Sequence, residues 1–164
     1  MSVIASNSAG KVSFDIGGLR SLAREIKASR NMRVRVGLFP NKAARKEGQA
    51  TNPEIGAIHE LGSKTHNIPA RSWLRMPIML YLRPLVEGKG RAWWRSSLST
   101  KGMQSTMKRL GLCAEEVIQN AFETGGFGHW RPLSKATIRA KGSSAILIDT
   151  AQLRKAVASK VVRV

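Results

Sequence analysis

Apolar and polar residues alternate most clearly in residues 32–39, which read MRVRVGLF. The apolar side chains at the even positions from 32 to 38 share one side of an extended chain, while Arg33 and Arg35 share the other. This period of two predicts a half-buried strand with a basic outer face. The segments VSFDI at 12–16 and SKVVRV at 159–164 predict two further, shorter strands.

Apolar residues that recur three and four positions apart predict helices elsewhere in the chain. The longest such segment covers roughly residues 102–124 and ends at a pair of glycines. A second segment, at 19–29, places Arg20, Arg24 and Lys27 on the side opposite its apolar residues, so we expect an amphipathic helix whose apolar side is buried.

Helix start and stop residues mark four further helices. Asn52 is the predicted N-cap of a short helix that Gly62 ends, and Ser134 is the predicted N-cap of another. A last short helix, AQLRKAV, should follow Asp149 or Thr150. A longer helix is expected to begin near Arg71 or Ser72 and to be kinked or divided by Pro77 and Pro84.

These elements include few strands and several helices, and strands and helices do not alternate in a βαβ rhythm. The sequence therefore predicts one α+β domain over 1–164, in which a small antiparallel sheet packs against a long helix and several short helices. The stretch PNKAARKEGQAT holds no large apolar residue, so we expect a mobile basic loop at about 40–52. The loop's Lys42, Arg45 and Lys46 could also contact a polyanion, and the two interpretations are compatible.

The charge balance is the most unusual feature of the composition. There are 28 Lys and Arg residues against 10 Asp and Glu residues, a formal charge of +18. Such an excess repels itself in a compact chain and is easier to tolerate beside nucleic acid, an acidic protein surface or an anionic membrane. No run of about 18 apolar residues and no signal-peptide core occurs, so we expect cytosolic synthesis and no membrane partner.

The adjacent pair His59 and Glu60 suggests catalysis but lacks the spacing of a metal site. A zinc-protease helix needs H-E-x-x-H, whereas position 63 is serine and His66 lies in a loop. The single Cys113 lies in an apolar helical stretch, where a buried thiol is expected, and the ten carboxylates are spread along the chain. The sequence thus favours no enzyme, metal or cofactor, and Glu60 is expected to fix the following loop, for example through Arg71.

Two tryptophans, Trp93 and Trp94, lie between Arg91 and Arg95. An aromatic and basic cluster of this kind can stack on nucleic-acid bases. It can equally form a subunit contact, where Trp and Arg are enriched. We favour the subunit contact.

Two motifs occur in order along the second half of the chain. The first is AIHELGSKTHNIPARSWLR at 57–75, and the second is WRPLSKATIRAKGS at 130–143 followed by LIDTAQLR at 147–154. In this order they resemble the bacteriophage neck and tail-completion family, which includes the morphogenesis protein of Mu-like phages and the tail-completion proteins of long-tailed siphophages. The chain departs from the family pattern at Ser72, usually proline, and at Ala151, usually glycine.

The resemblance implies a structural virion protein, made in the host cytoplasm, that forms a six-fold ring at the head–tail junction with neighbouring neck and tail proteins. Six subunits of +18 would carry about +108, a field that needs anions nearby. Tail terminator, head-to-tail adaptor and morphogenesis factor all remain open, as does a soluble protein that binds DNA non-specifically. The residues expected to face the DNA channel or a neighbouring ring are Arg33, Arg35, Lys42, Arg45 and Lys46, and the candidate subunit contacts are His59, Glu60, Ile68, Arg71, Trp93 and Trp94.

Overall fold

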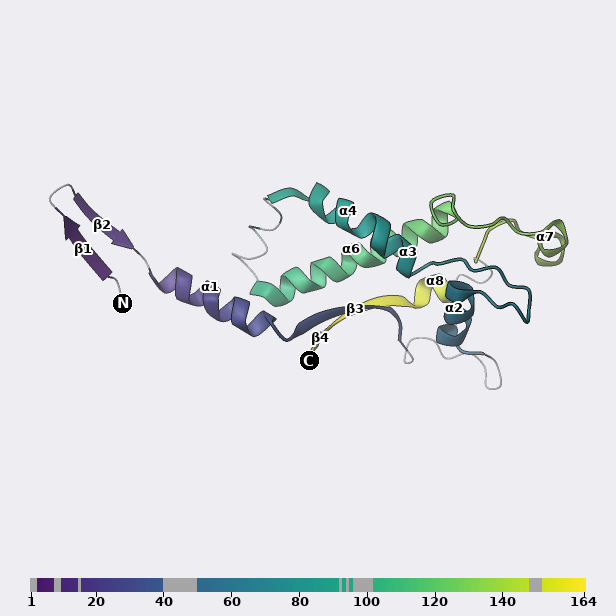
Figure 1. Cartoon of the computed structure of the whole chain (residues 1–164), viewed down its shortest axis with the longest axis horizontal. Helices are drawn as coiled ribbons and strands as arrows, with labels where there is room; N and C mark the ends of the chain where they lie inside the picture. The colour runs from purple at the N-terminus through teal and green to yellow at the C-terminus, as the bar shows by residue number, and fades with distance from the viewer. Residues whose placement is uncertain are drawn as a thin grey trace.

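The computed structural model describes residues 3–7, 10–14, 16–39, 50–91, 93, 95, 102–147 and 152–164. The fold is α+β, as predicted, with a small antiparallel sheet packed against a long helix (Figure 1). In chain order the elements are β1 (Val3–Asn7), β2 (Gly10–Phe14), α1 (Ile16–Ser29), β3 (Met32–Leu38), α2 (Asn52–Leu61), α3 (Arg75–Pro77), η2 (Ile78–Leu82), α4 (Arg83–Gly88), α6 (Gly102–Thr124), α7 (Lys135–Lys141), α8 (Gln152–Ala156) and β4 (Val157–Arg163).

The central sheet pairs β3 with β4 in antiparallel register, with Val36 opposite Ser159. One side of this sheet packs on α6, and Gly111 of α6 makes the close approach possible. A Cβ atom at position 111 would lie 2.9 Å from the Cβ of Ser159 and 3.4 Å from a methyl group of Val34. Glu115, one turn further along α6, accepts a hydrogen bond of 2.5 Å from the backbone N–H of Ser159. These contacts fix the sheet on the helix.

The core lies where the C-terminal half of α6 meets the chain segments around it. Ile118 and Phe122 of α6 are almost fully buried, and two tryptophan rings lie 5.9 Å from the Phe122 ring, Trp73 tilted and Trp130 edge-on. The two indole N–H groups donate to backbone carbonyls, Trp73 to Gly56 at 2.8 Å and Trp130 to Ser72 at 3.2 Å. Cys113 is buried as predicted, and burial raises the pKa of its thiol.

Two helix starts differ from the sequence prediction. The N-cap of α2 is Thr51 rather than Asn52, because the Thr51 hydroxyl accepts from the Glu54 N–H while the Glu54 carboxylate accepts from the Thr51 N–H at 2.7 Å. The next helix begins at Arg75 rather than near Arg71. From there α3, η2 and α4 form one continuous helix, and the chain accommodates its two prolines with the π-helical segment η2.

The N-terminal part differs more from the prediction. Residues 10–14 form a hairpin with residues 3–7, where a single strand at 12–16 was expected, and α1 begins at Ile16 rather than at 19. Figure 1 shows this hairpin beyond the far end of α1, away from α6 and the sheet. Leu19 and Ile26 are exposed, so the prediction that α1 buries its apolar side is wrong for these two residues.

Of the remaining short elements, α7 agrees with the sequence, whereas β4 begins at Val157, a residue predicted to end the last helix, rather than at 159. Ser134 is the N-cap of α7 and Gly142, in a left-handed conformation, ends it. Among the described helices, none has both the length and the apolar character that crossing a membrane requires. The predicted loop at about 40–52 lies outside the described residues from position 40 to 49, as do the proposed caps Asp149 and Thr150.

Candidate functional site

The outer side of the central sheet is basic. Arg33 and Arg35 of β3 are exposed, as the alternation predicted, and Arg35 is paired directly with the exposed Lys160 of β4. Lys160 also places its ammonium 4.4 Å from the centroid of the Phe39 ring. The ion pairs among the described residues involve Glu87, Glu116 and Glu123, and none of them reaches this surface. We call Arg33, Arg35 and Lys160 the basic sheet face.

Like charges directly opposite each other in a sheet destabilise it, by a few tenths of a kcal/mol to about 1 kcal/mol. Arg35 and Lys160 are such a pair, with Arg33 as a diagonal neighbour. The face is therefore suited to an anionic partner that would relieve this repulsion. Lys160 was not predicted from the sequence, because the register between β3 and β4 cannot be read from either strand alone.

The segment from Gly62 to Arg71, which we call the strap, folds back along α2. Gly62 turns the chain with a φ of 77°, a conformation that favours glycine. Ser63 and Ile68 exchange two backbone hydrogen bonds of 2.8 Å, and the Arg71 N–H donates to the carbonyl of His59 at 2.7 Å. The strap is thus held at both ends by backbone contacts.

Glu60 fixes the chain where the strap leads into α3. Its carboxylate accepts hydrogen bonds from the Ser72 hydroxyl at 2.6 Å and from three successive backbone N–H groups, at positions 73, 74 and 75, at 2.8, 2.9 and 3.1 Å. It therefore acts as a cap for the helix that follows, although it lies in a different helix. Glu60 fixes the following loop as expected, but the partner is this turn and not the Arg71 side chain.

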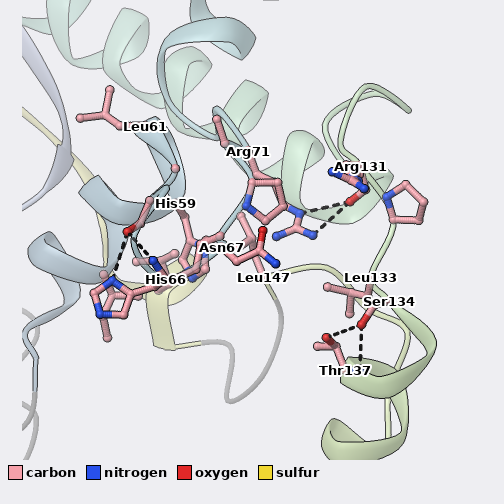
Figure 2. Close-up of a pocket in the computed structure, with 18 of the residues that line it drawn as sticks. His59, Leu61, His66, Asn67, Arg71, Arg131, Leu133, Ser134, Thr137 and Leu147 are labelled. Atoms are coloured by element: carbon pink, nitrogen blue, oxygen red, sulfur yellow. Dashed lines mark hydrogen bonds between the residues drawn. The ribbon is translucent and has the colours of Figure 1, made fainter.

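A cavity of about 1220 Å³ lies between the strap and the segment that leads into α7 (Figure 2). Arg71 is part of its wall and is only 6% exposed. As Figure 2 shows, its guanidinium points to the loop of Arg131, where Nε and Nη2 donate to the Arg131 carbonyl at 3.2 and 3.1 Å. Burial and the charge of Arg131 lower the pKa of Arg71. No carboxylate among the described residues forms an ion pair with this cation.

His59 lines the same cavity, and its pKa is also lowered. The main cause is burial, and the positive charges of Arg71 and Lys141 add to it. Its Nδ1 atom is buried and has no hydrogen-bond partner among the described residues. His66, in contrast, is exposed and shares a 3.1 Å hydrogen bond between its Nδ1 and the Ser63 hydroxyl. Within the described part of the chain, no three His, Cys, Asp or Glu side chains converge as a metal site would require.

The other sequence candidates are placed as follows. Ile68 is half-buried in the cavity wall. Trp93 is half-buried, with the Arg109 guanidinium of α6 5.9 Å from its ring centroid. The side chains of Trp94, Lys42, Arg45 and Lys46 lie outside the described residues. Subunit contacts through these residues stay a prediction, although Glu60 and Arg71 already have partners within the chain.

Sequence analysis also missed the link between the two motifs. Arg71 and Ser72 of the first motif contact the backbone of Arg131 and the indole of Trp130 in the second. The spacing of the residues contains no indication of this contact, since about sixty positions separate the partners. No family model, curated protein or solved structure matches the chain.

Proposed function

We propose that this chain is a structural virion protein of a bacteriophage head–tail junction. In this proposal, identical subunits form a ring around the DNA channel and join the tail to the head, without catalysing a reaction. The single observation that carries the proposal, beside the motif resemblance, is the basic sheet face, where Arg35 and Lys160 lie opposite each other and neither forms an ion pair with a described carboxylate.

Non-specific contact with phosphates suits such a face. Cations on a rigid strand attract the DNA backbone whatever its sequence, and base-specific contacts would slow the passage of a genome. The net charge of +18 over the whole molecule also attracts the DNA backbone. Arg33, Arg35 and Lys160 are therefore proposed to face the channel or an acidic neighbouring ring.

The contact between the two motifs supports a structural role for them. The carboxylate of Glu60 is used to hold the turn before α3, and the Arg71 guanidinium holds the loop at Arg131. A catalytic carboxylate would need to reach a substrate instead. These residues are proposed to build the subunit.

Exposed apolar side chains give the subunit surfaces for self-contact. Leu61 and Met79 are each 72% exposed, and Leu112 of α6 is 61% exposed. A closed ring requires two different surfaces on each subunit, one for each neighbour. Apolar side chains on separate elements, here α2, η2 and α6, can supply them.

Electron microscopy and mass photometry of the purified full-length protein, alone and with a short DNA duplex, test the proposal. We expect closed rings of one size, and density at the tail end when the protein is added to tails that lack it. A monomer under all conditions, with tight and steeply salt-dependent DNA binding, would instead support the alternative. Plasmid cleavage in the presence of Mg²⁺ or Zn²⁺ would contradict both functions.

The alternative is a soluble protein whose activity is non-specific DNA binding, and the basic sheet face favours it as well. The two functions differ in what the loss of apolar surface should do. Leu112→Ser should abolish rings and leave DNA affinity unchanged if the chain is a ring protein. If rings persist in this variant, Leu112 is not part of the contact between subunits, but the proposal of a ring still stands.

A further inference from the structure

The cavity beside the strap contains a buried cation, Arg71, that pairs with no carboxylate among the described residues. Arg71 is 6% exposed, and both described hydrogen bonds of its guanidinium go to one neutral acceptor, the Arg131 carbonyl. Its Nη1 group donates to no described residue. A buried charge is normally paired, because removing it from water without a partner destabilises the folded protein. Within the described part of the chain, no anion balances the charge of Arg71.

The rest of the cavity wall favours the same class of ligand. Its charged residues are all basic: Lys64, Arg71, Arg131 and Lys141, and no carboxylate is found among the described residues that line it. The wall also contains apolar side chains, Leu61, Ile68, Leu133 and Leu147 among them, beside uncharged polar ones such as Ser134 and Thr137. A ligand that fits would carry a negative group next to apolar side chains.

We propose that this cavity binds an acidic peptide segment of another protein, with a carboxylate placed against the free side of the Arg71 guanidinium. The planar guanidinium matches a carboxylate in shape and in hydrogen-bond geometry. A phosphate in a DNA duplex lies instead on a broad backbone, which meets cations on an open surface such as the basic sheet face. The cavity is recessed and half apolar, which favours the peptide.

This inference goes beyond the proposed function and stands on the cavity alone. A protein that forms no ring could still bind the peptide, and a ring protein could fail to bind it. Within a particle, such a site would allow an acidic tail of a neighbouring protein to bind at the strap, far along the chain from the basic sheet face. Peptide binding and ring formation are therefore measured separately.

The test uses the full-length protein and two fluorescein-labelled peptides, Gly-Leu-Asp-Leu-Asp-Gly and the same sequence with Asn for Asp. Binding is followed by fluorescence anisotropy at about 0.15 M salt, where attraction between distant exposed charges is largely screened. We expect the Asp peptide to bind at least about tenfold more tightly than the Asn peptide, since charge-assisted hydrogen bonds supply roughly 1.4 kcal/mol or more.

Three variants separate the cavity from general electrostatic attraction. Arg71→Gln should weaken binding of the Asp peptide by about tenfold or more. Arg131→Gln should also weaken it, and this change leaves the fold intact, because the exposed side chain is altered while the backbone carbonyl that holds Arg71 remains. Arg33→Gln removes the same charge from the basic sheet face and should leave binding of the Asp peptide unchanged.

Four outcomes would overturn the proposal. The first is that the two peptides bind equally well. The second is that Arg33→Gln and Arg131→Gln weaken binding of the Asp peptide equally. The third is that Arg131→Gln weakens binding of a short DNA duplex but not binding of the Asp peptide. The fourth is a wild-type protein that does not bind the Asp peptide although its Asp149→Asn variant does, because the chain itself would then supply the anion.

Discussion

The carboxylate of Glu60 accepts four hydrogen bonds at the point where the strap leads into α3. A serine hydroxyl and three consecutive N–H groups converge on it, which is the arrangement of a helix cap supplied from another helix. Without the carboxylate, these half-buried donors would have no acceptor among the described residues. Glu60 therefore caps α3 while the adjacent His59 lines the cavity, although the two look like one catalytic pair in the sequence.

Replacing Glu60 by Ala should lower the free energy of unfolding by about 2–3 kcal/mol, because several partly buried donors lose a charged acceptor together. Glu60→Gln keeps one acceptor oxygen and should cost less. Urea denaturation checks both values. Glu87→Ala is the matched control: Glu87 is an exposed helix residue that pairs only with Arg83, so its loss should cost about 0.5 kcal/mol or less. Equal effects at the two positions would contradict the capping role.

His59 gives the stability a dependence on pH. Its folded-state pKa is lowered, so below the ordinary value of about 6.5 the unfolded chain binds a proton that the folded chain does not. The stability is therefore fully present above about pH 6.5 and falls as the pH is lowered towards the folded-state pKa. His59→Gln should flatten the stability curve between about pH 7 and 5, measured by urea denaturation. His129→Gln, in an exposed turn, is the control and should leave the curve unchanged.

At the scale of elements, the contact between α6 and the sheet depends on a residue without a side chain. An alanine in a helix usually stabilises it by up to about 1 kcal/mol relative to glycine. At position 111 the added methyl group would overlap the side chain of Ser159 on β4, and the Ser159 Cβ, 2.9 Å away, cannot move aside by rotation of that side chain. The close packing should therefore outweigh the gain in helix propensity.

Gly111→Ala is expected to destabilise the protein by about 1–3 kcal/mol, the usual cost of overpacking a filled contact. Gly88→Ala, at the end of α4 with no atom within 4 Å of the added Cβ, should change stability by less than about 0.5 kcal/mol. Thermal unfolding followed by circular dichroism distinguishes the two. A stabilised Gly111→Ala variant would show that α6 does not lie this close to the sheet.

The elements with a regular period were predictable from the sequence, and those held by distant contacts were not. The predicted helix at 102–124 has the bounds of α6, and β3 matches the alternation at 32–39, because each buries one side along its whole length. The start of α3 was misplaced, because Glu60 holds the preceding residues out of helical geometry. The exposure of Leu19 and Ile26 on α1 was also not predicted, since periodicity shows that a side is apolar but not what covers it.

The same division holds for the candidate site. Alternation alone identified Arg33 and Arg35 as outward-facing, whereas Lys160 became part of the face only through strand pairing. The cavity around Arg71 was not predictable, because its second wall comes from the loop at Arg131. Neither strand register nor a contact across sixty positions leaves a local pattern in the sequence.

For the whole molecule, the excess charge and the extended N-terminal part are the features that the proposed assembly would use. The hairpin and α1 extend beyond the sheet and α6, as Figure 1 shows, and α1 exposes both apolar and basic residues. Arg35 and Lys160 carry like charges directly opposite each other, so their repulsion lowers the stability of the isolated subunit. Selection for stability alone would remove such a pair, so an anionic partner is the simplest reason for it.

The double variant Arg35→Gln and Lys160→Gln should therefore change stability and DNA binding in opposite directions. At low salt we expect its free energy of unfolding to exceed that of the wild type by up to about 1 kcal/mol. This difference should shrink as salt screens the repulsion. Its affinity for a DNA duplex should fall, and the slope of log affinity against log salt should decrease by about 2, since two phosphate contacts are lost. Arg20→Gln with Lys27→Gln removes the same charge from exposed positions on α1 and should alter the slope less. If both double variants lose DNA affinity equally, the net charge and not the basic sheet face would account for the binding.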